Sequence, residues 1–242
     1  NLYCETYKKV DKEKLFDMWG GNIKDSMQGL RDQYCEAHKK KEKDTIKLEF
    51  QKLLNPALGD TKDTSILKTY HPFDTCNMCE FFDAEFMFGV SEFDIVIGNP
   101  PYVQLQREGG KLADMYKDCG YDTFERMGDI YALFYEKGLQ LLKEKGNLCF
   151  ITSNKWMRAG YGKSLRGFFT LHNPKLLIDC GPGIFETATV DVNILLIQKA
   201  LNQKNLQAVT LDKKAKNQDL SQYIKDKLVT LNNLNEDAWF IG

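Results

Sequence analysis

The residues of this sequence that are best suited to chemistry form a short run of rigid hydrogen-bond acceptors. Asn99, Pro100, Pro101 and Tyr102 follow directly after the apolar run 93–97. Pro100 forces Asn99 into an extended conformation, and neither proline has an N–H group to donate. The side-chain carbonyl of Asn99 and the backbone carbonyl of Pro100 therefore form a fixed pair of acceptors beside the ring of Tyr102. Two acceptors next to a ring suit a planar molecule that carries an NH₂ group.

The same four residues could also form no more than a stiff turn, because Asn-Pro is a common turn signal. Four specified residues directly after a strand are much rarer than that dipeptide. Ligands of open α/β sheets also bind beyond the carboxyl ends of the strands. We therefore favour a functional site at residues 99–102.

The elements that must position this site alternate between strand and helix. Short apolar runs typical of strands occupy 93–97, 148–152, 176–179 and 190–197. Helical patterns lie between them, and one of these has Asp129 as its expected N-cap. This alternation predicts an α/β sheet. The nearly continuous run 93–97 is expected to be a buried parallel strand.

The pattern changes along the chain and predicts three parts. Residues 1–60 carry apolar residues at helical spacing, which indicates a helical segment, and the lysine-rich run 39–43 is a solvated helix face rather than a DNA contact. Residues 61–200 hold the strands and form the catalytic part. Residues 201–242 are polar and are predicted to be a linker towards a further domain.

Composition limits the class of protein. The 242 residues carry 33 Lys and Arg against 34 Asp and Glu, which excludes a uniformly basic nucleic-acid coat but not a local basic face. No apolar run reaches the ~20 residues of a membrane-spanning helix. Seven irregularly spaced cysteines indicate a reducing, cytoplasmic location. Cys76 and Cys79 form a lone pair, too few ligands for a structural zinc site, so no metal is expected.

The run from Phe93 to Tyr102 resembles the catalytic motif of S-adenosylmethionine-dependent methyltransferases that act on amino groups. The closest resemblance is to the adenine-specific (N6) DNA methyltransferases of bacterial restriction–modification systems, such as type II restriction enzyme/methylases. Residues 129–138 are similar to the helix after that motif, and 176–197 to the last pair of strands. The resemblance implies an α/β fold with a partial Rossmann-like methyltransferase sheet behind an N-terminal helical segment. It also implies S-adenosylmethionine as cofactor and double-stranded DNA as partner.

The resemblance also implies a role for each site residue. Asn99 and Pro100 would hold the two N–H groups of an adenine that has been flipped out of the duplex. Tyr102 would stack on the base, and a second aromatic residue, Phe185, would supply another ring, although a core role for Phe185 is the alternative. Phe134 would pack against the adenine of the cofactor and Asn99 would lie beside the cofactor, while the place of Phe134 on an apolar helix face explains it equally well.

Basic residues near the motif are candidates for contacts to DNA phosphates. Arg107, Arg126, Arg158 and Arg166 lie between the motif and the later helix, and Lys155 follows the second strand. Solvated surface is an equal alternative for these five residues. The glycine-rich run 179–183 is interpreted as a turn between two late strands and not as a cofactor loop, because β-branched residues rather than a helical pattern follow it.

The sequence departs from the family in one respect: no acidic, glycine-rich cofactor loop precedes residue 93. We therefore expect the chain to be a fragment that lacks the primary cofactor-binding strands and does not methylate alone. A target-recognition domain would follow it, and the same polypeptide could carry an endonuclease. Two alternatives remain: a methyltransferase of protein glutamine or RNA amino groups, and a non-catalytic DNA-binding scaffold.

Overall fold

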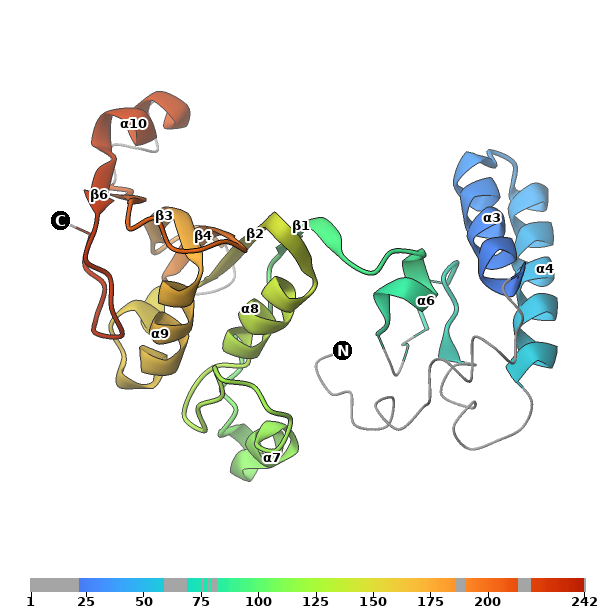
Figure 1. The fold of residues 1–242 in the computed structure, drawn as a ribbon, viewed down its shortest axis with the longest axis horizontal. Helices are drawn as coiled ribbons and strands as arrows, with labels where there is room; N and C mark the ends of the chain where they lie inside the picture. The colour runs from blue at the N-terminus through green and yellow to red at the C-terminus, as the bar shows by residue number, and fades with distance from the viewer. Residues whose placement is uncertain are drawn as a thin grey trace. The chain divides into compact units, whose positions relative to one another are not determined.

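The computed structural model describes residues 22–58, 69–74, 76–77, 79, 82–185, 190–212 and 219–241. The chain divides into two compact units, Asn1–Ser91 and Glu92–Gly242 (Figure 1). The expected boundary between the helical segment and the catalytic part, at residue 60, is therefore displaced to residue 91. The reason is that described residues between 69 and 88 pack with the helical segment: the Arg31 guanidinium donates to the Tyr70 hydroxyl, which itself donates to the carbonyl of Met87, and the Phe73 ring stacks on Tyr34 with centroids 4.2 Å apart.

The first unit contains the helices α3 (Asn22–Glu36), α4 (Lys40–Leu58) and the short α6 (Ala84–Phe88). Helices α3 and α4 pack through Met27, Phe50 and Leu54, which are almost fully buried. This confirms a helical segment over the described part of residues 1–60. The lysine-rich run is mostly exposed, as expected for a solvated helix face.

The second unit is built on a six-stranded mixed sheet of order β1-β2-β4-β3-β5-β6, which confirms the α/β class. The strands are β1 (Phe93–Gly98), β2 (Leu142–Ser153), β3 (Asn173–Gly181), β4 (Val192–Gln198), β5 (Leu206–Thr210) and β6 (Val229–Leu231). Strand β1 is parallel to β2 and β3 is parallel to β5, whereas β4 runs antiparallel to both β2 and β3. The run 179–183 spans the end of β3 and precedes β4, so it lies between two late strands, as predicted.

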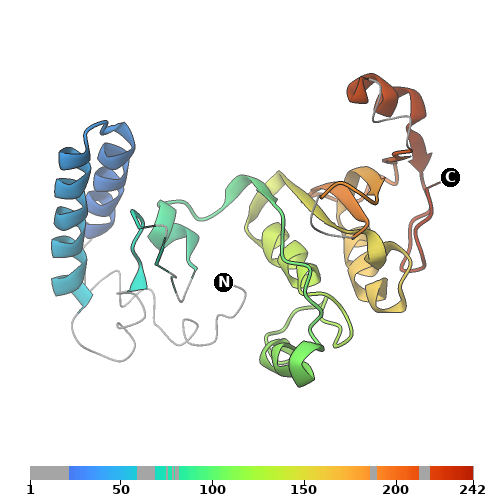
Figure 2. The ribbon, with the colours of Figure 1, turned by 180° about the vertical axis from the view of Figure 1, so that it is seen from behind.

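Helices lie on both faces of this sheet, because alternate residues of its strands belong to two separate core clusters. The helical elements of the second unit are α7 (Arg107–Tyr116), α8 (Tyr131–Gln140), the 3₁₀ turns η2 (Asn154–Met157) and η3 (Gly160–Gly162), α9 (Lys163–Leu171) and α10 (Leu220–Lys227). Helices α8 and α9 lie on the same side, and both contribute to the main core (Figures 1 and 2). Helix α8 approaches β2 so closely that a Cβ at Gly138 would lie 2.4 Å from Leu148. No helix among the described residues is long and apolar enough to cross a membrane.

Strand β1 lies at the edge of the sheet, and the expectation that it is buried is wrong. Among the described strands it pairs with β2 alone, and on one face Val96 packs against the main core. On the other face Ile95 and Ile97 are 66% and 78% exposed. An edge strand and a central strand can have the same apolar composition, so the sequence pattern did not distinguish them.

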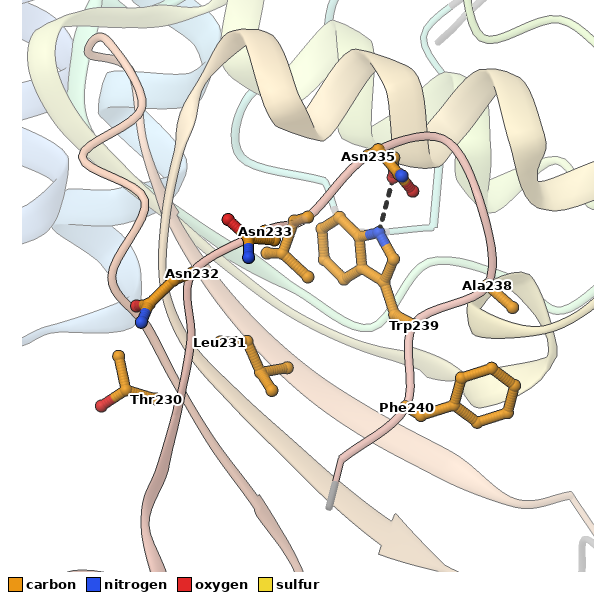
Figure 3. A pocket seen from close by; sticks show the side chains of 9 residues that line it. Thr230, Leu231, Asn232, Asn233, Asn235, Ala238, Trp239 and Phe240 are labelled. Atoms are coloured by element: carbon orange, nitrogen blue, oxygen red, sulfur yellow. Dashed lines mark hydrogen bonds between the residues drawn. The ribbon is translucent and has the colours of Figure 1, made fainter.

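The predicted linker 201–242 is also wrong for its described residues, because these add strands β5 and β6 and helix α10. Beyond β6 the chain returns to the core at Trp239, which is 2% exposed and lies 5.3 Å from the ring of Trp156. The Trp239 backbone N–H donates to the carbonyl of Met157. Its indole N–H donates to the backbone carbonyl of Asn235, as Figure 3 shows. Both residues line a pocket of about 430 Å³ formed by residues 230–235 and 238–240.

Candidate active site

The carboxyl ends of β1, β2 and β3 lie along the same edge of the sheet, the one at which these strands end. Strands β1 and β3 both run in the direction of β2, since β1 is parallel to β2 and β3 shares with β2 the antiparallel partner β4. The segments that follow β1, β2 and β3 therefore lie at the same edge. A hydrogen bond of 2.9 Å from Asn154, just after β2, to Asp179, near the end of β3, joins two of them. The run 99–102 follows the third strand, at the edge where a ligand of an α/β sheet is expected.

The run 99–102 presents its asparagine to solvent on a fixed backbone. Asn99 and Pro101 are exposed, and Pro100 between them is buried. Within the described chain, no side chain or backbone group is hydrogen-bonded to the Asn99 side chain, so its carbonyl is available to a ligand. The Tyr102 hydroxyl donates to the carbonyl of Ile151 at 3.3 Å. Burial raises the pKa of Tyr102, so this hydroxyl stays protonated at neutral pH.

The two aromatic residues expected to hold a base lie next to each other. The rings of Tyr102 and Phe185 have centroids 6.4 Å apart and planes inclined by 56°. Two rings that sandwich a flat base lie parallel and about 7 Å apart, twice the contact distance between carbon atoms. The 6.4 Å spacing of the two rings is close to this distance, but their inclination of 56° departs from the parallel arrangement. Tyr131 also packs edge-on against Tyr102, with ring centroids 6.3 Å apart.

Phe134 lies on α8, half-buried, and packs against the main core. Its contact with a cofactor stays a prediction.

Asp129, the expected N-cap of α8, does not cap this helix. Ile130 holds the N-cap position, without a side-chain hydrogen bond, and Asp129 instead accepts a hydrogen bond from Tyr161. Burial, together with the carboxylate of Asp129, raises the pKa of Tyr161 to about 12.

The segment after Tyr102 is tied to the segment before α8. The Ile130 N–H donates to the carbonyl of Val103, and the Leu105 N–H donates to the carbonyl of Gly128. Between these bonds Gln104 forms a β-bridge with Asp129. Gln104 is thereby held at the edge that carries Tyr102.

The candidate DNA-binding cations fall into three groups. Lys155 and Arg158 line one pocket of about 450 Å³, together with Gln104, Asn154, Ala159 and Tyr161. Arg126 is not part of that pocket and pairs with Asp114 at 2.8 Å, and Arg107 is exposed at the start of α7. Arg166 is buried and its guanidinium donates to the carbonyls of Trp156, Ala159 and Glu236, so a phosphate contact for Arg166 is wrong.

Sequence reasoning missed Gln104, Asn154 and Tyr161. Asn154 had a usable signal, because it follows a predicted strand just as Asn99 does. Gln104 and Tyr161 had none, since only the folded chain brings them to the same pocket. In the part of the chain that the structure describes, no cluster of three or more His, Cys, Asp or Glu side chains is arranged to hold a metal ion.

Comparison with known proteins gives a family for residues 1–185, which match the model described as "Eco57I restriction-modification methylase". The type II methyltransferase M.BstVI of Geobacillus stearothermophilus is 39% identical over 79 residues, 33% of this chain and 14% of that protein. The type II restriction enzyme and methyltransferase RM.Eco57I of Escherichia coli is 28% identical over 146 residues, 58% of this chain and 13% of that protein. The chain thus spans about one seventh of the length of these curated relatives.

Among solved structures, the ATP-dependent type ISP restriction-modification enzyme LlaBIII, bound to DNA, matches 81% of this chain and 17% of its own, at 13% identity and a TM-score of 0.48. A putative class I S-adenosylmethionine-dependent methyltransferase of Listeria monocytogenes matches 57% of this chain at 18% identity and a TM-score of 0.42.

Proposed function

The chain belongs to the Eco57I restriction-modification methylase family, and from this premise we propose that it is the catalytic part of a DNA methyltransferase specific for the N6 amino group of adenine. The observation that carries the proposal is the exposed Asn99 side chain, which has no hydrogen-bond partner among the described residues and lies at the carboxyl edge of the sheet. The adjoining ring of Tyr102 supplies the apolar plate that a purine needs.

The proposed mechanism is positioning plus electrostatics. The lone pair of the adenine amino nitrogen is delocalised into the ring, which makes that nitrogen a poor nucleophile. Hydrogen bonds from its two N–H groups to the Asn99 side chain and the Pro100 carbonyl favour a pyramidal nitrogen and localise the lone pair. S-adenosylmethionine, when bound, supplies the electrophilic methyl group.

We further propose that the base is held outside the duplex, because a paired base cannot reach the Asn99 side chain. Stacking on Tyr102 is worth about 1–3 kcal/mol. The hydroxyl bond of Tyr102 to Ile151 and the edge-on contact with Tyr131 fix the ring before the base arrives. Phe185 would have to turn from its 56° inclination to stack on the other face.

The described residues fit one side of a cofactor site: Asn99, and Phe134 with its half-buried ring. The rest we assign to another part of the same polypeptide, which adds a strand beside β1, the outermost strand of the described sheet, and covers Ile95 and Ile97. Exposed apolar edge strands are rare in isolated domains because they recruit further strands. On this proposal the chain alone is inactive, and a target-recognition domain and an endonuclease belong to other parts of the protein. Because the proposed substrate is DNA, we also propose a cytoplasmic location.

The test is the Asn99→Ala variant of the full-length protein, assayed for transfer of a labelled methyl group to plasmid DNA and for N6-methyladenine by mass spectrometry. Loss of one preorganised electrostatic partner costs about 10²–10³ in kcat. The matched control is Asn205→Ala, which removes an exposed asparagine side chain just before β5. Unchanged methylation by Asn99→Ala would refute the mechanism. Transfer to protein glutamine or RNA instead of DNA would refute the substrate.

A further inference from the structure

A polar pocket lies beside the proposed base site and is not used by the proposed mechanism. It encloses about 450 Å³ and is lined by Gln104, Asn154, Lys155, Arg158, Ala159 and Tyr161. Gln104 is two residues beyond Tyr102 along the chain and is held there by its bridge to Asp129. A group bound in this pocket therefore lies next to the molecule that stacks on Tyr102.

The loop that carries Lys155 and Arg158 is fixed on three sides. Trp156, between them, is completely buried against Phe169 and Trp239. The buried guanidinium of Arg166 binds the carbonyls of Trp156 and Ala159. Asn154 is anchored by its bond to Asp179. Such a loop presents its cations without the entropy cost of ordering a free loop on binding.

The charges of the pocket are arranged with the cations outside and the carboxylates behind. Lys155 is exposed and has no carboxylate partner within the described segments of the chain. The Arg158 side chain is 59% exposed, and its guanidinium lies 3.9 Å from Asp179. Asp129 and Asp179 are both buried. Asp129 already accepts a hydrogen bond from Tyr161, and Asp179 accepts hydrogen bonds from Asn154 and from the Gly181 N–H. An anion that enters the pocket meets the two cations first.

We infer that this pocket binds a backbone phosphate of the DNA next to the extruded nucleotide; this inference rests on the proposed function. Lysine, arginine and side-chain amide groups are the donors that proteins use for DNA phosphates. When one side of the Arg158 guanidinium faces Asp179, its other N–H groups can still donate to a phosphate. Lys155 is the main contact, and Arg158 and the amide of Gln104 complete the site.

The experiment measures binding of the full-length protein to fluorescent duplexes by anisotropy, between 50 and 200 mM salt. One duplex carries the site that is methylated in the plasmid assay and another lacks it. One phosphate contact contributes about 0.9 to the slope of log K against log salt, which is about 3.5-fold in affinity over this range. We expect Lys155→Gln to reduce the slope by this amount on both duplexes, because phosphate contacts carry no sequence information.

The matched control is Lys143→Gln, which removes the same charge near the amino end of β2, at the opposite edge of the sheet, where Lys143 pairs with the exposed Asp94. It should leave the slope unchanged, and Lys155→Arg should restore it. An unchanged slope for Lys155→Gln overturns the inference, and so does a loss of affinity confined to the cognate duplex, which would indicate a base contact. The proposed function fails separately, if the wild-type protein transfers no methyl group to DNA.

Discussion

Gly162 is the position where one added methyl group should disturb the loop 154–159 most. A Cβ at Gly162 would lie 2.1 Å from the carbonyl oxygen of Trp156 and 2.7 Å from the nearest guanidinium nitrogen of Arg166. The carbonyl would have to retreat by roughly 1 Å to reach normal contact distance. Overpacking of this kind costs about 1–3 kcal/mol. Weakening the hydrogen bond between Arg166 and the carbonyl of Trp156 costs roughly a further 1.5–3 kcal/mol. Because the two effects are coupled and do not simply add, we expect Gly162→Ala to lower the free energy of local opening by about 3 kcal/mol.

This local destabilisation can be measured by hydrogen exchange in the intact protein. A change of 3 kcal/mol in the free energy of local opening corresponds to about 150-fold faster exchange. The reporting amides are those of Arg158, Ala159 and Gly162, which all donate within the loop. The matched control is Gly160→Ala in the same 3₁₀ turn, where a Cβ would meet nothing within 4 Å. Equal protection of the reporting amides in the two variants would refute the packing argument.

Three further outcomes test other parts of the structure. Tyr102→Ala should raise the KM for DNA by about 5- to 150-fold through lost stacking of about 1–3 kcal/mol, whereas Tyr102→Phe should change it little; equal effects in steady-state kinetics would contradict the stacking role. Burial and Asp179 raise the pKa of Cys180 from 9.0 to about 11, so between these pH values the thiol ionises in the unfolded protein but not in the folded one. The free energy of unfolding should therefore fall as the pH rises from 9 to 11, and urea titrations of Cys180→Ala should lack this contribution. Ile97→Lys should weaken cofactor binding by the full-length protein in calorimetry if another strand and its cover bury this 78% exposed side chain; wild-type binding would contradict that assembly.

The main elements of the second unit could be predicted because their apolar runs are interrupted by strong signals. The run ending at Gly98 and the turn at Gly181 and Gly183 gave the strands β1, β3 and β4 close to their observed bounds. The exposure of β1 could not be predicted, because its position at the sheet edge depends on strand order. A resemblance, and not spacing, suggested the pairing of Tyr102 with Phe185, which the structure brings within 6.4 Å.

The errors in the last part of the chain have a different cause. Strand β5 is only five residues long, and its three buried residues, Leu206, Ala208 and Val209, are flanked by the polar residues Gln207 and Thr210, so its apolar run is too short to stand out. Arg166 was a candidate for the surface because an arginine is rarely buried. Its cost of burial is offset by three carbonyls that lie 7, 10 and 70 residues away along the chain, which no local pattern reveals.

The return of the chain to the core at Trp239 restricts how modules can be exchanged in this family of enzymes. A chimaera that joins a foreign recognition module upstream of residue 239 would remove the indole that covers Trp156, and loss of a buried aromatic side chain of this size costs about 3–5 kcal/mol. The same cut would deprive Arg166 of its bond to Glu236. A junction placed after Ile241 keeps both contacts and so leaves this core intact.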